Sequence, residues 1–435
     1  MWAYESVFYQ IYPLGFCGAP FENDGITQSR ILKVNDWIPH MKALGCSAVY
    51  FSPVFESDTH GYNTRDFTKI DTRLGTNEDF AAVCRALHDA GIRVVLDGVF
   101  NHVGRGFWAF RDVLKNRWDS PYRDWFHIDF NGNSNYNDGL WYEGWEGNYD
   151  LVKLNLRNED VIRHIFDSIR LWVELFDIDG LRLDVAYCLD HDFIRRLRSY
   201  TDGLKADFFL VGETLHGNYN VLMNDEMLHS VTNYACYKGL YSSFNSMNMF
   251  EIIHSLQRQF GPEYWTEYKG KHLLSFVDNH DVTRVASILN NPSHLQLIYA
   301  LLFGMPGIPC VYYGSEWGAK AKKSEGDPAL RACFDAPVEN KLSAWIGHLA
   351  RAKKSSSALN YGGFVSMVLT NKQCVFLREA QEQRVFVAIN ADAEEYVAHF
   401  DCGCGIFRDL ITGEERPTGG GIHLPGYSAY FFECR

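Results

Sequence analysis

The sequence has no long hydrophobic run and no surplus of basic residues. No window approaches the roughly 18 unbroken apolar residues of a membrane-spanning helix. Its 41 Lys and Arg residues stand against 54 Asp and Glu, which gives a net charge of −13. Nucleic acids and anionic membranes bind basic surfaces, so we expect neither as a partner. The first 13 residues lack the basic and apolar segments of a signal peptide, which predicts a cytoplasmic location.

The cysteines form no framework either. There are 11, an odd number, and they are scattered without paired C-x-x-C motifs. The nearest pair is Cys402 and Cys404. Disulfide scaffolds and zinc sites show regular cysteine spacing. We therefore expect reduced thiols, several of them buried, as in a cytosolic protein.

What the sequence does have is a regular alternation of apolar runs and helical patterns. With 435 residues, of which 46% are hydrophobic, it can bury a large core. The runs are apolar throughout, which is typical of parallel strands covered on both faces. The expected strands are residues 6–12, 47–52, 93–97, 178–184, 208–213, 229–234, 273–278 and 308–312. Expected helices include residues 159–176 and 77–90, the latter capped by Thr76. Eight such repeats predict a (β/α)₈ TIM barrel, although alternation alone would also permit an open doubly wound sheet.

Two segments interrupt this alternation. Residues 103–152 are rich in Trp, Tyr, Asn and Gly, and an insertion of this length is usually functional. After residue 354, short β-forming segments are separated by Gly and Asp clusters, which predicts a C-terminal antiparallel β-sandwich over 355–435. The barrel is therefore expected to comprise residues 1–102 and 153–354, with an inserted domain over 103–152.

Ionisable residues follow four of the predicted strands at the point where each strand ends. These endings are DGVFNH at 97–102, GLRLD at 180–184, GE at 212–213 and DNHD at 278–281. In barrels of this class the reactive groups lie at the C-terminal ends of the strands. Carboxylates without a basic surplus suit acid–base and nucleophilic work on a neutral substrate, and glycoside hydrolysis requires two such groups. The aromatic insertion fits sugar binding, because pyranose rings pack their apolar faces on Trp and Tyr.

In this order, the four motifs resemble the signature regions of the α-amylase family of glycoside hydrolases. The similarity extends from about residue 6 to 350, and the tail fits the family's β-sandwich. Further similar segments are VFYQIYP at 7–13, YFSPVF at 50–55, HGYNTRDF at 60–67, VKLN at 152–155 and GMPGIPCVYYGSE at 304–316.

The resemblance implies a role for each acid at the rim. Asp184 resembles the nucleophile, which forms a covalent glycosyl-enzyme, and Glu213 resembles the general acid, which later activates water. Asp281 resembles the third carboxylate, which favours the positively charged transition state. Arg182 lies two residues before Asp184, on the same face of the strand, and should keep it ionised. Glu213 must start protonated, so we expect burial and nearby charges to raise its pKa.

Other residues are expected to bind the sugar. His102 and His280 resemble the two histidines that hydrogen-bond the reacting sugar, and Tyr62 resembles the aromatic residue that stacks beneath it. In the insertion, Trp141 and Trp145 are expected to form one wall of the sugar groove, from their composition and position.

The resemblance also implies structural support and allows a metal. Asp97 resembles a structural acid that supports Arg182. Asn101 resembles a ligand of the calcium ion that many α-amylases hold between barrel and inserted domain. A structural Ca²⁺ is therefore an option, while catalysis needs no cofactor. Calcium takes six to eight oxygen ligands. The acids of the insertion offer no loop signature for it; they are Asp112, Asp119, Asp124 and Asp129.

The implied function is retaining hydrolysis of α-1,4-glucosidic bonds in malto-oligosaccharides or starch, as by an α-amylase, with α-glucan oligosaccharides as the only expected partners. The subgroup stays open. Many family members carry Lys-His, or in the neopullulanase and cyclomaltodextrinase branch Asn-Glu, where this sequence has Tyr187 and Cys188. VKLN, in contrast, resembles the MPKLN of that branch. The alternative is an α-1,6-acting or transglycosylating enzyme, such as an oligo-1,6-glucosidase, a neopullulanase or a glucanotransferase.

Two hypotheses come from other classes of protein. A metal-dependent hydrolase would leave Arg182 and Glu213 without a role. Its ligands would be Asp97, His102, His280 and Asp281. A non-catalytic sugar-binding barrel would have lost its acids, whereas all three carboxylates are present. The sequence does not define the oligomeric state.

Overall fold

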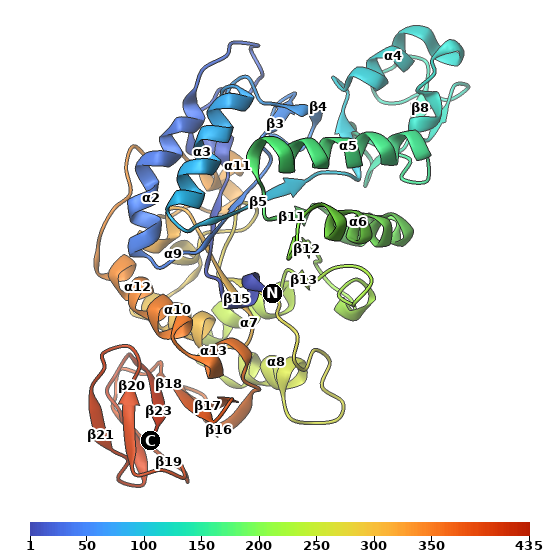
Figure 1. The fold of residues 1–435 in the computed structure, drawn as a ribbon. Coiled ribbons are helices and arrows are strands. Elements are labelled where there is room, and N and C mark those ends of the chain that lie inside the picture. The colour runs from blue at the N-terminus through green and yellow to red at the C-terminus, as the bar shows by residue number, and fades with distance from the viewer.

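A computed structural model describes all 435 residues, and its central element is an eight-stranded parallel barrel (Figure 1). The strands neighbour one another in the order β13-β12-β11-β5-β2-β1-β15-β14. A parallel bridge from Thr232 to Leu274 joins the two outermost strands and closes the ring. The predicted TIM barrel is confirmed, and the open sheet is excluded. The strands are β1 Phe8–Ile11, β2 Ala48–Phe51, β5 Arg93–Gly98, β11 Gly180–Leu183, β12 Phe209–Gly212, β13 Ser230–Val231, β14 Leu274–Phe276 and β15 Ile308–Tyr312.

Helices surround the barrel, and their ends follow local sequence signals. α3 (Asn77–Asp89) starts at a capping box, in which Thr76 and Asp79 bond each other's backbone N–H groups. α5 (Glu159–Phe176) has the predicted bounds and is capped by the Asn158 side chain. The other helices of the barrel region are α1 Pro13–Phe16, α2 Val34–Ala43, α6 His191–Leu204, α7 Tyr234–Asn245, α8 Phe250–Phe260, α9 Val285–Ile288, α10 His294–Gly304, α11 Asp327–Leu330 and α12 Lys341–Lys354.

Alternation along the strands decides which side chains reach the mouth of the barrel. Phe8, Tyr50, Val95 and Val211 pack together in the barrel interior. Because side chains alternate between the two faces of a strand, residues two positions further on also point inward, one layer nearer the C-terminal end. This layer consists of Gln10, Ser52, Asp97 and Glu213, and β11 adds Arg182 and Asp184. The register of the barrel thus brings the predicted acids to one place.

The inserted segment forms a small domain that extends from the barrel on the side away from the C-terminal domain (cyan in Figure 1). β10 (Asn148–Lys153) pairs with β6 (His102–Gly104) and with β9 (Gly144–Trp145), and so ties the insertion to the end of β5. Its remaining elements are α4 Trp108–Asn116, β7 Ile128–Asp129 and β8 Trp141–Tyr142. A hairpin of β3 (Phe55–Ser57) and β4 (Thr64–Ile70) lies between β2 and α3.

The C-terminal domain is the predicted antiparallel β-sandwich. A six-stranded sheet, β16-β17-β18-β23-β20-β21, shares an apolar core with the pair β19-β22. The short helix α13 (Ser357–Tyr361) precedes it and lies against β17 and β18, while α10 lies against β18 and β23. The strands are β16 Val365–Leu369, β17 Gln373–Ala380, β18 Gln383–Asn390, β19 Tyr396–His399, β20 Ile406–Asp409, β21 Glu415–Pro417, β22 Gly421–Leu424 and β23 Ser428–Cys434.

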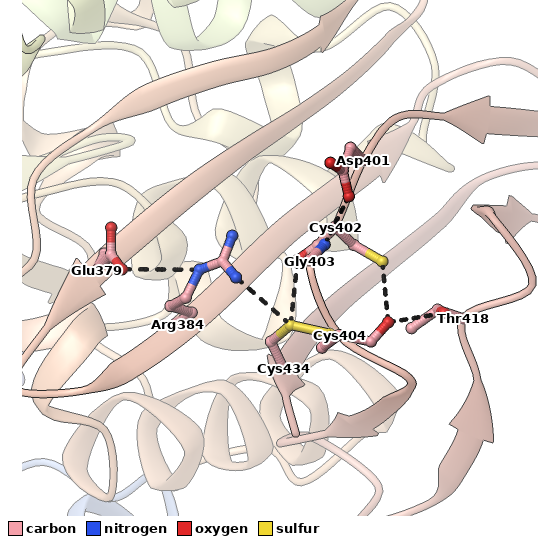
Figure 2. Close-up of a disulfide and its surroundings, with 8 residues drawn as sticks. All are labelled: Glu379, Arg384, Asp401, Cys402, Gly403, Cys404, Thr418 and Cys434. Carbon is pink, nitrogen blue, oxygen red and sulfur yellow. Dashed lines mark hydrogen bonds and ion pairs between the residues drawn. A yellow bond between two sulfur atoms is a disulfide. The ribbon is translucent and has the colours of Figure 1, made fainter.

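One expectation about the cysteines is wrong. Cys404 and Cys434 form a disulfide at the edge of this domain, with Cα atoms 5.8 Å apart (Figure 2). The register of β20 with β23 sets Phe407 opposite Cys434 and so brings the preceding loop alongside. Two cysteines 30 residues apart gave no sign of this in the sequence. The other nine are free thiols, most of them buried as expected.

None of the helices combines the length and apolarity that crossing a bilayer requires.

Candidate active site

Arg182 lies at the centre of a buried cluster of carboxyl groups. Its guanidinium is 3.0 Å from both oxygens of Asp97 and 2.8 Å from Oδ1 of Asp184. It is also 2.8 Å from Oε1 of Glu213. All four residues are less than a tenth exposed. Because one rigid guanidinium contacts both Asp184 and Glu213, these two carboxyl groups face the same small volume.

The backbone directly after Asp184 is strained, and the strained residue holds Glu213. Val185 has φ 40° and ψ 47°, a left-handed conformation that is rare for a β-branched residue. Its N–H donates a hydrogen bond of 3.0 Å to Oε2 of Glu213. Such strain often marks a functional site. Here it fixes the second oxygen of Glu213 while Arg182 contacts the first.

One guanidinium cannot balance three ionised carboxyl groups. Burial raises the pKa of Asp97 to about 7 and that of Asp184 to about 7, with Arg182 opposing the rise at both. Burial also raises the pKa of Glu213; Arg182 opposes this, and the negative charge of Asp281 adds to it. The raised pKa of Glu213 matches its predicted role as a general acid. At Asp184 the expected effect of Arg182 is present, but burial outweighs it, so the pKa of Asp184 is raised rather than lowered.

Asp281 has different surroundings and a different charge state. Its Oδ1 accepts a hydrogen bond of 2.8 Å from Arg331, and its Oδ2 lies 3.0 Å from Nε2 of His280. Burial on its own would raise the pKa of Asp281, but His280 and Arg331 outweigh it and lower the pKa to about 2. Asp281 is therefore a permanent negative charge in the site at neutral pH.

Both predicted histidines are buried and neutral. Burial lowers the pKa of His102 to about 3 and that of His280 to about 3. The ring of His280 is fixed by Gln10, 2.7 Å from its Nδ1, and by the Tyr62 hydroxyl, 2.5 Å from its Nε2. Nε2 of His102 is buried without a hydrogen-bond partner in the protein and lies 3.9 Å from Oδ2 of Asp184. A neutral imidazole in this position can exchange hydrogen bonds with a hydroxyl group.

These groups border a cavity of 540 Å³ at the mouth of the barrel. The predicted residues that line it are Tyr62, His102, Trp145, Asp184, Glu213 and Asp281. Three other predicted residues lie beneath and hold the lining in place, namely Asp97, Arg182 and His280. The ring of Tyr62 stacks on that of His280 at 5.7 Å, and its hydroxyl donates to Asp97.

Of the two tryptophans that were expected to wall the sugar groove, one lines the cavity and the other does not. Trp145 lines the cavity and lies 5.9 Å from the ring of His102. Trp141 pairs with Asp129 across β7 and β8, is 38% exposed, and donates to the Tyr149 hydroxyl. It does not reach the cavity, because the alternation of β8 turns Tyr142 inward and Trp141 outward.

The structure groups no acidic side chains with Asn101 that could hold a metal ion. Asn101 is buried and its amide lies 3.1 Å from Nδ1 of His102. In the insertion, Asp112 already accepts from Asn116 and Ser120. No three His, Cys, Asp or Glu side chains are grouped to hold a metal anywhere in the chain. The same observation removes the ligand set that a metal-dependent hydrolase would need.

Several site residues were not predicted. Arg331 follows α11, contacts both Asp281 and Asp327, and lies 4.6 Å from the ring centre of Tyr12. It sits in a loop without periodicity, so nothing in the sequence pointed to it. Gln10 could have been found, because a lone amide interrupts an otherwise apolar strand. Tyr187 also lines the cavity, at the position where the sequence departs from the pattern of the family that it resembles.

Comparisons with known proteins agree with this geometry. Residues 10–341 match the family described as Alpha amylase, catalytic domain. A cyclomaltodextrinase from Thermoanaerobacter pseudethanolicus is 27% identical over 99% of this chain and 78% of its own length. Neopullulanase 2 from Thermoactinomyces vulgaris is 31% identical over 95% of this chain and 74% of its own.

A solved structure resembles the whole chain. The ligand-free cyclic alpha-maltosyl-(1→6)-maltose hydrolase from Arthrobacter globiformis has a TM-score of 0.84 at 26% identity, and each chain covers 100% of the other. The family match, together with the parallel barrel and the carboxyl groups at its mouth, makes the protein a glycoside hydrolase. The chain belongs to the α-amylase family of glycoside hydrolases, and it is similar to cyclomaltodextrinases and neopullulanases.

Proposed function

We propose that this protein hydrolyses α-1,4-glucosidic bonds in malto-oligosaccharides by a retaining double displacement. The observation that carries the proposal is the single guanidinium of Arg182, which holds the carboxyl groups of Asp184 and Glu213 side by side at one cavity. Retaining glycosidases need an acid and a nucleophile close enough to flank one glycosidic bond, whereas inverting enzymes set their acid and base further apart to admit a water molecule.

In the first step, protonated Glu213 donates its proton to the glycosidic oxygen, and Asp184 attacks the anomeric carbon. The bond to the leaving sugar breaks and a covalent glycosyl-enzyme forms. In the second step, ionised Glu213 removes a proton from water, the water attacks the same carbon, and Asp184 leaves. The raised pKa of Glu213 suits the first step, since the group must carry a proton near neutral pH.

The surrounding residues stabilise and orient the reacting sugar. Asp281, ionised at neutral pH, faces the positive charge that develops on the sugar ring. His102 is neutral, and its unpartnered Nε2 can hydrogen-bond a sugar hydroxyl without adding a competing positive charge. His280, also neutral, holds Tyr62 and Asp281 in place beneath the sugar. Tyr62 and Trp145 supply the aromatic faces, and Asp97 serves as the support beneath Arg182.

A second candidate substrate is a cyclic maltodextrin. The named relatives favour it, because they include a cyclomaltodextrinase and a hydrolase of a cyclic alpha-maltosyl-(1→6)-maltose. Ring opening uses the same chemistry at the same carboxyl groups. On this proposal the enzyme works in the cytoplasm and requires no cofactor.

A time-resolved product profile tests the proposal. Maltotriose through maltoheptaose, pullulan, panose and a cyclodextrin are incubated with the enzyme, and early products are separated by chromatography. Cleavage of maltoheptaose without release of maltose from panose supports α-1,4 hydrolysis, because maltose forms from panose only when its α-1,6 bond is cut. Early opening of the cyclodextrin supports the second candidate. Absence of cleavage in all substrates would refute both, and products longer than the substrate would indicate glycosyl transfer.

A further inference from the structure

A second hollow lined by aromatic rings lies where α10 and α12 meet the C-terminal domain. None of its lining residues borders the cavity at the barrel mouth. Figure 1 shows these two helices (orange) beside the red sheet. Two cavities of 620 and 230 Å³ adjoin there and share Gln296 and Tyr427. We call this hollow the seam groove. Its other aromatic lining residues are Trp317, Trp345 and Tyr430.

We propose that the seam groove binds a segment of α-glucan chain, as a binding site separate from the cavity at the barrel mouth. The choice of an α-glucan over another neutral polyhydroxyl compound rests on the proposed function. Nothing in the catalytic steps uses the groove.

Tyr427 is the central residue of the groove, and the fold holds its ring in place against its backbone preference. Its φ is 51°, in the left-handed region that bulky residues rarely adopt. The hydroxyl accepts a hydrogen bond from Asn291, and the N–H donates to the carbonyl of Asp392. One edge of the ring meets His294, and 38% of the residue is exposed. Such strain persists only where the surroundings impose it, and it often accompanies function.

The rest of the groove combines aromatic faces with uncharged polar groups. Trp345 is anchored by its Nε1, which donates to the backbone carbonyl of Gln296. The side-chain amide of Gln296 is exposed and makes no hydrogen bond within the protein. The Asn340 amide donates to the carbonyl of Trp317, and its oxygen caps α12. Rings with a few placed amides form the usual lining of sites for neutral ligands.

The charges of the groove argue against an anionic ligand. Asp409 is 3% exposed and its oxygens accept bonds from Ile411, Thr412 and Phe431, so its charge is satisfied inside the domain. Lys341 is the single cation of the lining. One exposed lysine does not make an anion site, whereas a neutral chain of sugars matches the remaining groups.

The shape favours a chain over a single small molecule. A third cavity, of 380 Å³, adjoins the larger of the two through Asn340 and adds His40 and Glu339 to the lining. The three cavities follow α12 from Lys341 to Trp345, and they connect α2 at His40 with the C-terminal domain at Tyr430. A series of adjoining hollows can hold several linked sugar units.

Retardation in native gels that contain amylose tests the proposal. All proteins carry Glu213→Gln, so that the polysaccharide is not consumed during the run. The test variants are Tyr427→Asn and Gln296→Ala. Asn tolerates the left-handed conformation, so the first variant is expected to fold; Gln296 is exposed and unbonded, so the second keeps the fold as well. The control is Tyr264→Ala, which removes an aromatic residue that is 98% exposed elsewhere.

We expect Tyr427→Asn to weaken amylose retention by about tenfold, as for the loss of a central aromatic contact, and Gln296→Ala to weaken it less. The control should migrate like the parent protein. Equal retention of parent and Tyr427→Asn, or no retention of the parent, would overturn the proposal. Hydrolysis of maltotriose by the unsubstituted enzyme tests the proposed function separately. If amylose retention depends on Tyr427 but the enzyme cleaves no sugar, the binding site is supported and the proposed hydrolysis is refuted.

Discussion

The cavity at the barrel mouth and the seam groove are both walled by aromatic rings, but they differ in charge. At the mouth, register brings three carboxyl groups and a guanidinium into a buried volume. In the seam groove the lining is almost uncharged. Burial shifts the pKa of an ionisable group, so the first place can perform acid–base chemistry. The second can only bind. Aromatic rings alone therefore do not identify a catalytic site in this protein.

The largest effect is expected from a substitution that abolishes catalysis but preserves substrate binding. Asp184→Asn takes away the nucleophile but keeps the size of the side chain, so kcat on maltoheptaose should fall by at least about 10⁴-fold. Binding of maltoheptaose, measured by titration calorimetry, should persist.

Glu226→Gln is the matched control for a lost carboxylate. Glu226 is an exposed acid that pairs with Arg195 on the surface. Its substitution should leave kcat within about twofold of the wild type. Turnover by Asp184→Asn at more than a few per cent of the wild-type rate would contradict the assignment.

The next effect concerns the shared charge of the cluster. Asp97→Asn removes one of three carboxylates around Arg182. Its negative charge favours protonation of Asp184 and Glu213, so its loss lowers the pKa of both. Ionisation of Asp184 sets the acid limb of the kcat/KM profile and protonation of Glu213 the alkaline limb.

Both limbs should therefore move to lower pH in Asp97→Asn, whereas Glu226→Gln should leave them in place. The profile of kcat/KM from pH 4 to 10 measures this. Limbs that stay fixed, or that move to higher pH, would show that Asp97 does not share the proton of the cluster.

A smaller effect separates the two tryptophans of the insertion. Trp145→Ala should lower kcat/KM by more than about tenfold, because this ring lines the cavity. Trp141→Ala should change it by less than about twofold, since this ring faces outward from β8. Equal losses in both variants would mean that substrate extends over the outer face of the inserted domain.

The smallest effect is expected from metal removal. Since no group of side chains is placed to hold a metal, Tm in excess chelator and in added calcium should agree within about 1 °C. Differential scanning calorimetry checks this. A Tm several degrees higher in calcium would contradict this and would support the structural calcium ion that the resemblance allows at Asn101.

The fold could be predicted because apolar runs alternate with helical patterns along the chain, and the carboxyl cluster because its residues follow the ends of single strands. Asp97, Arg182, Asp184 and Glu213 lie at the ends of apolar runs, and the period of two places them on the inner face. The bounds of α5 were predictable from a sustained helical period, and the structure adds the Asn158 cap.

What could not be predicted depends on contacts between distant segments or on backbone angles. Arg331 reaches Asp281 from a loop 50 residues away. The strain at Val185 has no residue pattern, and the disulfide follows from the register of β20 on β23. The seam groove exists only because a separate domain packs against two helices of the barrel, so its rings come from segments that share no motif.

The most direct test of the account is to trap and locate the covalent intermediate. The enzyme is incubated with a 5-fluoro-α-glycosyl fluoride of maltose, which forms the glycosyl-enzyme rapidly and releases it slowly, and its peptides are analysed by mass spectrometry. The account predicts one modified peptide, with the fluorinated maltosyl group on the carboxyl of Asp184. A sugar attached to any other residue would contradict it, as would a β-anomeric first product from maltoheptaose by NMR.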